Sequence, residues 1–230
     1  MPRRRPSRRR VRASSAAGGS AEPGRKAVIK SRFGDRLDGW LEAALPFLFR
    51  RRINPNVLTV IGTAVSIGAG AAFAFGHFGW GAIAILVGGV FDLIDGVIAR
   101  KHGIATAFGA FLDSTLDRLA DMAILLGIML HYAARGDAGT VLLGGIALIA
   151  SVMTSYAKAR AEQFVSSFSG GFLERGERLV VLGVGAVAGL MVPALWFLAV
   201  AGTGTVAYRF ALAHRELARL DEQKLGEHPG

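Results

Sequence analysis

Five aspartates fall within residues 91–121, although long apolar runs border this stretch on both sides. They are Asp92, Asp95, Asp113, Asp117 and Asp121. Ionised carboxylates beside so apolar a chain are costly unless something compensates their charge. The nearby arginines, Arg100 and Arg118, do not match five acids. A hard divalent ion, or two ions sharing the cluster, would compensate them, because Mg²⁺ and Mn²⁺ take oxygen ligands and commonly bridge to substrate phosphates.

Helical spacing arranges these aspartates on two facing surfaces. An arc of about 100° on the first helix carries four residues of interest: Asp92, Asp95, Gly96 and Ala99. The other three aspartates are four residues apart and share one flank of the next helix. A short turn at residues 101–106 makes the two helices antiparallel neighbours, so we expect their acidic faces to meet. Gly96 and Gly109 lack side chains where a bulky ligand would approach the backbone. Asp121 lies deepest and has no assigned partner, which favours a solvated carboxylate there.

Hydrophobic residues make up 52% of the 230-residue chain and are pooled in three charge-free runs, residues 53–91, 138–157 and 179–208. A membrane-spanning helix needs about 20 apolar residues. We predict an all-α polytopic membrane protein with six transmembrane helices, near residues 57–76, 79–100, 106–133, 138–162, 176–192 and 193–213. An additional amphipathic helix over residues 31–52 would lie in the membrane interface, because its apolar residues recur at helical spacing between charges.

Charge is distributed unevenly along the chain. Residues 1–52 carry 15 Lys and Arg against 4 Asp and Glu, whereas the remainder is close to neutral. We interpret residues 1–30 as a disordered basic tail and residues 216–230 as a polar C-terminal tail. Lys and Arg alternate between successive inter-helix segments, which predicts that both termini and the aspartates face the cytoplasm at the cell (plasma) membrane. No nucleic-acid partner is expected, and the absence of cysteine excludes disulfides and thiolate metal sites.

The aspartates also form a recognisable motif. Residues 92–117 read D-x2-D-G-x2-A-R-x8-G-x3-D-x3-D, and the segment Pro55-Asn56-x2-Thr59 precedes them. This pattern resembles the signature of the CDP-alcohol phosphatidyltransferases, with every specified position filled. The resemblance implies a six-helix domain of that family over residues 53–215. It also implies an enzyme that transfers a phosphatidyl group from CDP-diacylglycerol to the hydroxyl of an alcohol and releases CMP.

The resemblance further implies roles for individual residues. Asp92, Asp95 and Asp113 would ligate Mg²⁺, with Mn²⁺ as the alternative, and Asp117 would join them when two ions are bound. Asp117 would also be the general base that deprotonates the acceptor hydroxyl. The residues implied to bind the CDP-lipid are Asn56, Thr59, Gly96, Ala99, Arg100 and Gly109. We also expect the chain to act as a homodimer in the lipid bilayer.

A second polar cluster bears on the identity of the acceptor. Four cations follow in the later helices: Lys158, Arg160, Arg175 and Arg178. We expect them to bind the phosphate of a phosphorylated alcohol, and flanking charge on the cytoplasmic side is the competing interpretation. Lys158 and Arg160 are two residues apart and therefore point to roughly opposite sides of a helix. The pattern SYxKARAE…GGFxERxER resembles the phosphatidylinositol-phosphate synthase branch of the family, which implies inositol phosphate as the acceptor.

Two other functions fit part of the pattern. A phosphatidylglycerophosphate synthase, using glycerol 3-phosphate, would need the same aspartates and a similar cationic acceptor site. A divalent-cation transporter would instead carry carboxylates through the depth of the membrane on several helices. The aspartates gather at one end of two helices, and the far halves of those helices are apolar. The sequence therefore favours a transferase over a transporter.

Overall fold

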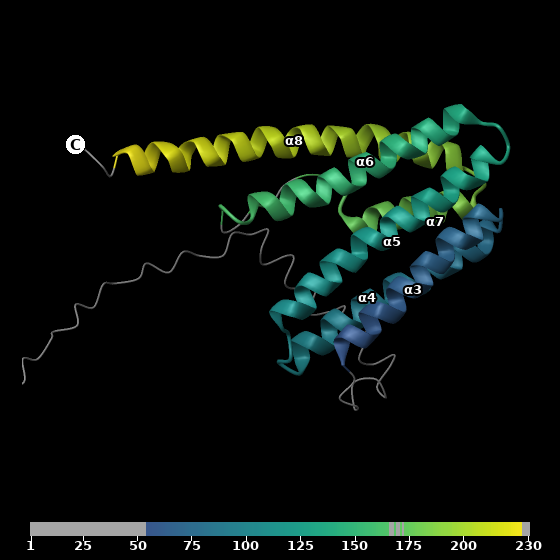
Figure 1. Ribbon diagram of the computed structural model, residues 1–230, viewed down its shortest axis with the longest axis horizontal. Helices are drawn as coiled ribbons and strands as arrows, with labels where there is room; N and C mark the ends of the chain where they lie inside the picture. The colour runs from purple at the N-terminus through teal and green to yellow at the C-terminus, as the bar shows by residue number, and fades with distance from the viewer. Residues whose placement is uncertain (1–53, 166–167, 169–170, 172, 227–230) are drawn as a thin grey trace, which may run out of the picture. The chain divides into compact units, whose positions relative to one another are not determined.

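The computed structural model describes residues 54–165, 168, 171 and 173–226. Within these ranges the chain is helical and contains no strand. Figure 1 shows the helices of this part, which are α3 (Pro55–Ala74), α4 (Phe78–Lys101), α5 (Ala107–Ala133), α6 (Ala138–Ala161), α7 (Arg175–Val187) and α8 (Met191–Gly226). The all-helical fold class predicted from the sequence is confirmed for these residues. The predicted tail at 1–30 and the predicted interfacial helix at 31–52 lie outside them.

The ends of the first four helices agree with the predicted spans to within two residues. α7 ends at Val187, five residues before its predicted limit, because Gly189 follows with a left-handed φ of 69°. α8 begins at Met191 and continues through Gly226. Residues 216–226, which we assigned to a polar tail, are therefore helical.

Four of the helices are long and apolar enough to cross a membrane: α3, α4, α6 and α8. α5 has sufficient length, but four charged residues occupy positions between 113 and 121. α7 has 13 residues, fewer than the roughly 20 needed to cross the hydrocarbon core. The chain is thus a membrane protein, and helix length and composition identify four of the six predicted spans.

Glycines let α3 approach both of its principal neighbours, α4 and α5. A Cβ atom added to Gly127 of α5 would collide with the carbonyl of Gly70 on α3, and one added to Gly70 would collide with the carbonyl of Ala123. On the other side of α3, a Cβ added to Gly62 would lie 2.9 Å from Cβ of Phe91 on α4. Small residues permit such backbone contact between helices in lipid, where packing rather than the hydrophobic effect drives association. α3 is therefore the element against which α4 and α5 are both positioned.

The two halves of the aspartate motif are joined by a tight, capped turn. α4 ends at Lys101, and Gly103 adopts a left-handed φ of 62°, which glycine tolerates without steric cost. Thr106 then caps α5, because its hydroxyl oxygen accepts a hydrogen bond of 2.9 Å from the backbone N–H of Gly109. The chain reverses direction within five residues, so the last turns of α4 and the first turns of α5, which carry the motif, lie side by side (Figure 1).

At the other end of the bundle, Asp137 caps α6. Its carboxylate accepts hydrogen bonds from the Thr140 backbone N–H at 2.9 Å and from the Thr140 hydroxyl at 2.7 Å. The hydroxyl contact and the backbone contact hold the pKa of Asp137 below its usual range. This acid is therefore accounted for as a helix cap, well separated in sequence from the aspartate motif.

The close α3–α5 contact generates a paired stability prediction. Gly70→Ala should lower the melting temperature of the detergent-solubilised protein, because overpacking at a backbone contact costs about 1–3 kcal/mol. Gly68→Ala, two residues earlier on the same helix, is the control, since nothing lies within 4 Å of a Cβ built there. It should leave the melting temperature unchanged or slightly higher, because alanine favours the helix. Equal effects of the two substitutions would contradict the packing described for Gly70.

Candidate active site

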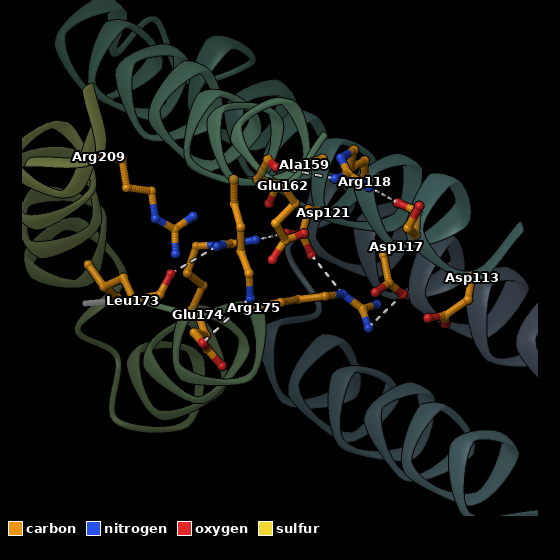
Figure 2. Close-up of a pocket in the computed structure, with 14 residues that line it drawn as sticks. Asp113, Asp117, Arg118, Asp121, Ala159, Glu162, Leu173, Glu174, Arg175 and Arg209 are labelled. Atoms are coloured by element: carbon orange, nitrogen blue, oxygen red, sulfur yellow. Dashed lines mark hydrogen bonds and ion pairs between the residues drawn. The ribbon is translucent and has the colours of Figure 1, made fainter. Parts of the chain in front are cut away.

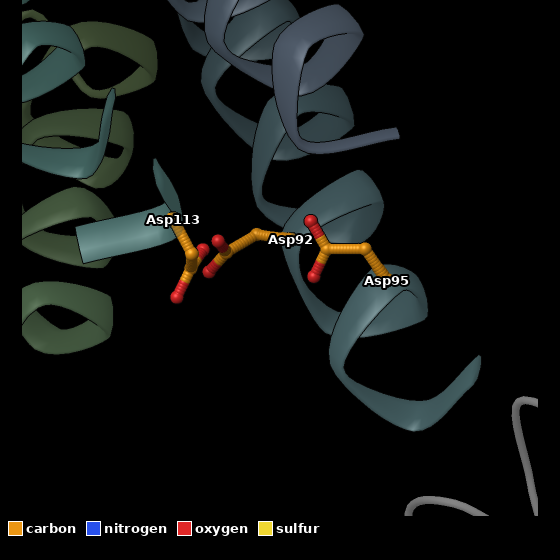
Figure 3. Close-up of side chains that lie close together, drawn as sticks. All are labelled: Asp92, Asp95 and Asp113. Atoms are coloured by element: carbon orange, nitrogen blue, oxygen red, sulfur yellow. The ribbon is translucent and has the colours of Figure 1, made fainter. Parts of the chain in front are cut away.

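Three carboxylates from two helices converge at the aspartate end of the bundle. Asp92 and Asp95 come from α4 and Asp113 from α5, and one oxygen from each lies within 4.8 Å of the others (Figure 3). Asp95 is buried, and Asp92 and Asp113 are half-buried. Oδ1 of Asp113 is buried without a hydrogen-bond partner among the described residues. A buried anionic oxygen that lacks a donor needs a cation, so this donor set fits a hard divalent ion. The predicted meeting of the acidic faces is confirmed for these three residues.

The buried member of this group is held by α3. The hydroxyl of Thr59 lies 2.5 Å from Oδ2 of Asp95 and 3.1 Å from the carbonyl oxygen of Pro55. Thr59 is 7% exposed and Asp95 5% exposed, so water has little access to this hydrogen bond. The family resemblance implies that Thr59 binds the CDP-lipid. In the structure, the Thr59 hydroxyl donates a hydrogen bond that orients the Asp95 carboxylate of the acidic cluster.

Asp117 does not join the group of three but contacts a cation from a distant part of the chain. Nη1 of Arg175, the first residue of α7, lies 2.8 Å from Oδ1 of Asp117 and 2.9 Å from Oδ2 of Asp92. Figure 2 shows this side chain reaching across from α7 toward Asp117. Arg175 is thus a compensating cation in addition to the nearby Arg100 and Arg118. Proximity in sequence could not reveal it, because it lies more than fifty residues from Asp117 and Asp121.

Asp121 also has cationic partners, which corrects its interpretation as a solvated carboxylate. Its Oδ2 lies 2.6 Å from Nη2 of Arg178, and its Oδ1 lies 3.4 Å from Nε of Arg175. Arg178 additionally donates a hydrogen bond of 3.0 Å to the carbonyl oxygen of Leu173. Asp121 and Arg178 are 7% and 6% exposed, so each charge depends on the other. The pair ties α7 and the segment before it to α5.

A cavity of about 430 Å³ extends from the aspartates to the cationic segment. Its lining contains ten charged residues, five acidic and five basic: Asp113, Asp117, Asp121, Glu162, Glu174, Arg118, Lys158, Arg175, Arg178 and Arg209. Asp113 and Arg209 lie at opposite ends of the drawn pocket, and residues of both charges lie between them (Figure 2). The cavity thus joins Asp113 of the acidic cluster to a lining that carries Lys158, Arg178 and Arg209, here called the cationic wall, beside Glu162 and Glu174.

The four cations singled out from the sequence do not all reach this cavity. Lys158, Arg175 and Arg178 line it, whereas Arg160 is exposed and hydrogen-bonds the side chain of Gln163. Lys158 lies 4.0 Å from a carboxylate oxygen of Glu174, an outer limit for an ion pair. The prediction that Lys158 and Arg160 point to different sides of their helix is therefore confirmed, and of the two only Lys158 faces the cavity.

Arg209 is a cavity residue that sequence reasoning missed. It is 3% exposed on α8, and its guanidinium donates a hydrogen bond to the carbonyl oxygen of Thr154 on α6. The available signal was its position, because Arg209 is the first charge after thirty charge-free residues. In sequence alone, a lone arginine at the end of an apolar helix is indistinguishable from ordinary flanking charge. Burial distinguishes it from that class.

The residues expected near the nucleotide form two small groups. Asn56 of α3 lies beside Gly109 of α5, since a Cβ on Gly109 would be 3.1 Å from Oδ1 of Asn56. On α4, the guanidinium of Arg100 lies over Gly96, 3.2 Å from a Cβ built there. Ala99 is half-buried on the same turn. Larger side chains at the two glycines would displace these polar neighbours, so the glycines keep both groups close to the backbone.

Comparison with known proteins identifies this arrangement. The sequence matches the CDP-alcohol phosphatidyltransferase family over residues 52–207, well over half of the chain. The chain belongs to this family. It is therefore a membrane-embedded transferase of phospholipid biosynthesis, as the motif at residues 92–117 predicted.

Its relatives include named enzymes. The phosphatidylinositol phosphate synthase of Mycobacteroides abscessus is 40% identical over 184 residues, which cover 76% of this chain and 83% of the relative. The archaetidylinositol phosphate synthase of Methanothermobacter thermautotrophicus is 38% identical over 153 residues, covering 66% and 75%.

Solved structures of the Mycobacterium tuberculosis phosphatidylinositol phosphate synthase are also similar. The one with CDP-DAG bound has a TM-score of 0.67 and 33% identity, covering 75% of this chain and 92% of that chain. The complex with manganese and citrate has a TM-score of 0.68 and 33% identity, covering 75% and 88%. The acidic cluster and the manganese complex of this relative together indicate use of a divalent metal by the family member described here.

The hydrogen bond between Thr59 and Asp95 yields a second paired prediction. Thr59→Val removes the donor and keeps the shape, so the Mn²⁺ concentration for half-maximal CMP release should rise roughly tenfold or more. Thr63→Val is the matched control, because its buried hydroxyl bonds only the carbonyl of Thr59 within its own helix. A metal titration of both variants checks this. An unchanged titration for Thr59→Val would show that the hydroxyl does not orient the carboxylate.

Proposed function

We propose that this enzyme transfers a phosphatidyl group from CDP-diacylglycerol to a hydroxyl of inositol phosphate and releases CMP. The observation that carries the proposal is a cavity that extends from Asp113 of the acidic cluster to the buried cations Arg178 and Arg209. An acceptor with a phosphate at one end and a reacting hydroxyl at the other matches that separation of charge. The relatives are named phosphatidylinositol phosphate synthase and archaetidylinositol phosphate synthase, and a product with an inositol phosphate headgroup supports the same acceptor.

The metal in this proposal is Mg²⁺, with Mn²⁺ as a substitute. Asp92, Asp95 and Asp113 would hold it, because they offer one oxygen each within a small, half-buried space. When bound, the ion would offset charge on the diphosphate of the CDP-lipid and stabilise the departing CMP. Thr59 fixes the orientation of Asp95 from the far side of the cluster.

Asp117 is proposed as the base for the acceptor hydroxyl. It lines the cavity between the acidic cluster and the cationic wall, one helical turn from Asp113. The acceptor oxygen forms a bond to the lipid phosphorus, the bond from that phosphorus to CMP breaks, and the hydroxyl proton passes to the Asp117 carboxylate. A carboxylate is a weak base toward an alcohol, so positioning and electrostatic stabilisation must supply much of the rate.

Lys158, Arg178 and Arg209 are proposed to bind the acceptor phosphate. All three line the cavity, and two of them are buried, which strengthens a charge-assisted contact with an anion. Arg178 is already oriented by Asp121, so it presents its guanidinium with little loss of side-chain entropy. Arg160 is left out of this group because it does not line the cavity.

The nucleotide is proposed to lie against the other side of the aspartates, over the two glycines. The groups concerned come from the first turn of α3, the last turns of α4 and the first turn of α5, and are Asn56, Gly96, Ala99, Arg100 and Gly109. Arg100 would contact a phosphate and Asn56 the cytidine. The diacyl chains then remain in the bilayer beside the exposed apolar faces of α3 and α4.

In the membrane, we propose six spans with the site on the cytoplasmic side of the plasma membrane. α5 contacts α3 closely at Gly70 and Gly127, and α3 is apolar enough to cross the membrane, so α5 is proposed to cross it beside α3. α7 packs against α4 and α8, which are both candidate spans. Basic residues gather at the aspartate end of the bundle, which the positive-inside rule places in the cytoplasm. The functional unit is proposed to be a homodimer.

An acceptor panel tests this function directly. Purified full-length protein, CDP-diacylglycerol and Mg²⁺ are offered inositol phosphate, glycerol 3-phosphate, free inositol or serine, and CMP release is measured. Inositol phosphate should give the highest kcat/KM. Lys158→Gln should lower kcat/KM for it about tenfold or more, mainly through KM, since a charge-assisted contact contributes roughly 1.5–3 kcal/mol.

The panel has a built-in control two residues along the same helix. Arg160→Gln removes a cation that lies outside the cavity, so it should leave the acceptor KM close to wild type. Free inositol should respond little to Lys158→Gln, because it has no phosphate. A preference for glycerol 3-phosphate would replace the proposed acceptor, and equal losses for both forms of inositol would remove Lys158 from the acceptor site.

The role of Asp117 has its own test. Asp117→Asn should abolish CMP release while CDP-diacylglycerol still binds in a metal-dependent way, because a base removes a proton without holding the nucleotide. Asp113→Asn is the comparison and should weaken metal-dependent binding of the CDP-lipid as well, through loss of an anionic ligand. Wild-type turnover by the Asp117 variant would exclude it as the base.

A further inference from the structure

Arg175 lies where the acidic cluster and the cationic wall meet. It is the first residue of α7, and the backbone at this point is fixed by a capping box between Glu174 and Glu177. From this anchor the side chain extends into the cavity and is 17% exposed. One nitrogen, Nη1, contacts carboxylates from two different helices, Asp92 of α4 and Asp117 of α5. The guanidinium therefore compensates acids that belong to the proposed metal and base positions.

The Asp92 carboxylate that Arg175 contacts is also one of the proposed metal ligands. Asp92 belongs to the group of three whose oxygens lie within 4.8 Å of one another, and Oδ2 of Asp92 is 2.9 Å from the guanidinium. A guanidinium and a divalent ion repel each other at such separations, and both attract the same carboxylates. We therefore expect binding of the ion to weaken the hold of Arg175 on Asp92 and Asp117.

The side chain has a second attachment that it can keep. Its Nε lies 3.4 Å from Oδ1 of Asp121, and Asp121 is held in place by Arg178. Arg175 can thus leave Asp92 and Asp117 and still lie in the cavity beside Arg178. An anion that enters the cavity there would attract the released guanidinium, because a planar fork suits a phosphate.

We propose that Arg175 is a mobile counterion that competes with the divalent ion for Asp92 and Asp117 and is drawn away by the acceptor phosphate. Metal and acceptor then favour each other's binding, since each relieves the same competition. The inference rests on the proposed function, because it takes the metal and acceptor positions from it. It adds that Arg175 is a positioning residue that links the two.

Mn²⁺ binding to the full-length protein in detergent, without CDP-lipid, tests the competition apart from turnover. Titration followed by electron paramagnetic resonance of free Mn²⁺ gives the affinity. Arg175→Gln should tighten Mn²⁺ binding, roughly tenfold for a coupling of ordinary size. A merely structural arginine would have the opposite effect or none. Arg175→Lys keeps the charge but loses the forked guanidinium, so its Mn²⁺ affinity should lie between those of wild type and Arg175→Gln.

Arg118→Gln is the matched control for loss of a positive charge from the cavity. Arg118 lines the same cavity, but its guanidinium bonds the carbonyl oxygens of Ser114 and Ser155. It should change Mn²⁺ affinity much less than Arg175→Gln. Adding Asp113→Asn to the Arg175→Gln chain should remove the tight binding, which locates the ion at the acidic cluster.

The second arm measures coupling in the wild-type chain, which does not depend on how any variant folds. Saturating inositol phosphate should tighten Mn²⁺ binding to wild type and should have little effect on Arg175→Gln. The proposal is overturned if Arg175→Gln binds Mn²⁺ no more tightly than wild type, or if inositol phosphate leaves wild-type affinity unchanged. If the Asp113→Asn variant bound Mn²⁺ as tightly as wild type, the proposed metal site would be overturned, and the inference with it.

Discussion

The structure depends on the compensation of like charges at the edge of an apolar bundle. Five aspartates lie on α4, which is apolar enough to cross a membrane, and on its neighbour α5, and their mutual repulsion must be balanced for the helices to stay together. The protein supplies part of that balance itself, through Arg175, Arg178 and the hydroxyl of Thr59. What remains uncompensated, above all the buried oxygen of Asp113, defines the position of the ion that the chemistry needs.

This compensation requires backbone precision, which the glycines of α3 and α5 provide. The contact at Gly70 and Gly127 fixes the height of α5 against α3, and Gly62 fixes α4 against the other side of α3. α3 also carries Thr59, so one helix both spaces the two acidic helices and orients one of their carboxylates. The spacing of the motif therefore places the carboxylates together only because α4 and α5 both pack closely against α3.

The sequence predicted local features well and partnerships across the fold poorly. Helix positions followed from long apolar runs and clear punctuation, so the ends of α3 to α6 agree to within two residues. The grouping of Asp92, Asp95 and Asp113 followed from fixed spacing on helices joined by a short turn. The partners of Asp121 could not be predicted, because they come from α7, and nothing in the sequence shows which turn of α7 faces α5. Arg209 was missed for the same reason, since burial at the end of a long helix is a tertiary property.

The opposite placement of Asp113 and Arg209 along one cavity has a consequence for selectivity among acceptors (Figure 2). With Asp113 and Asp117 toward one end and Arg209 at the other, basic end, the cavity would admit a phosphorylated acceptor in one orientation. It would then select acceptors by the distance between the phosphate and the reacting hydroxyl. A cyclic polyol presents several chemically similar hydroxyls, and reactivity alone does not distinguish them. With its phosphate fixed at the basic end, only the hydroxyl at the right distance and angle reaches Asp117. On the proposed reaction, the regiochemistry of the lipid product is therefore set by the length of the cavity.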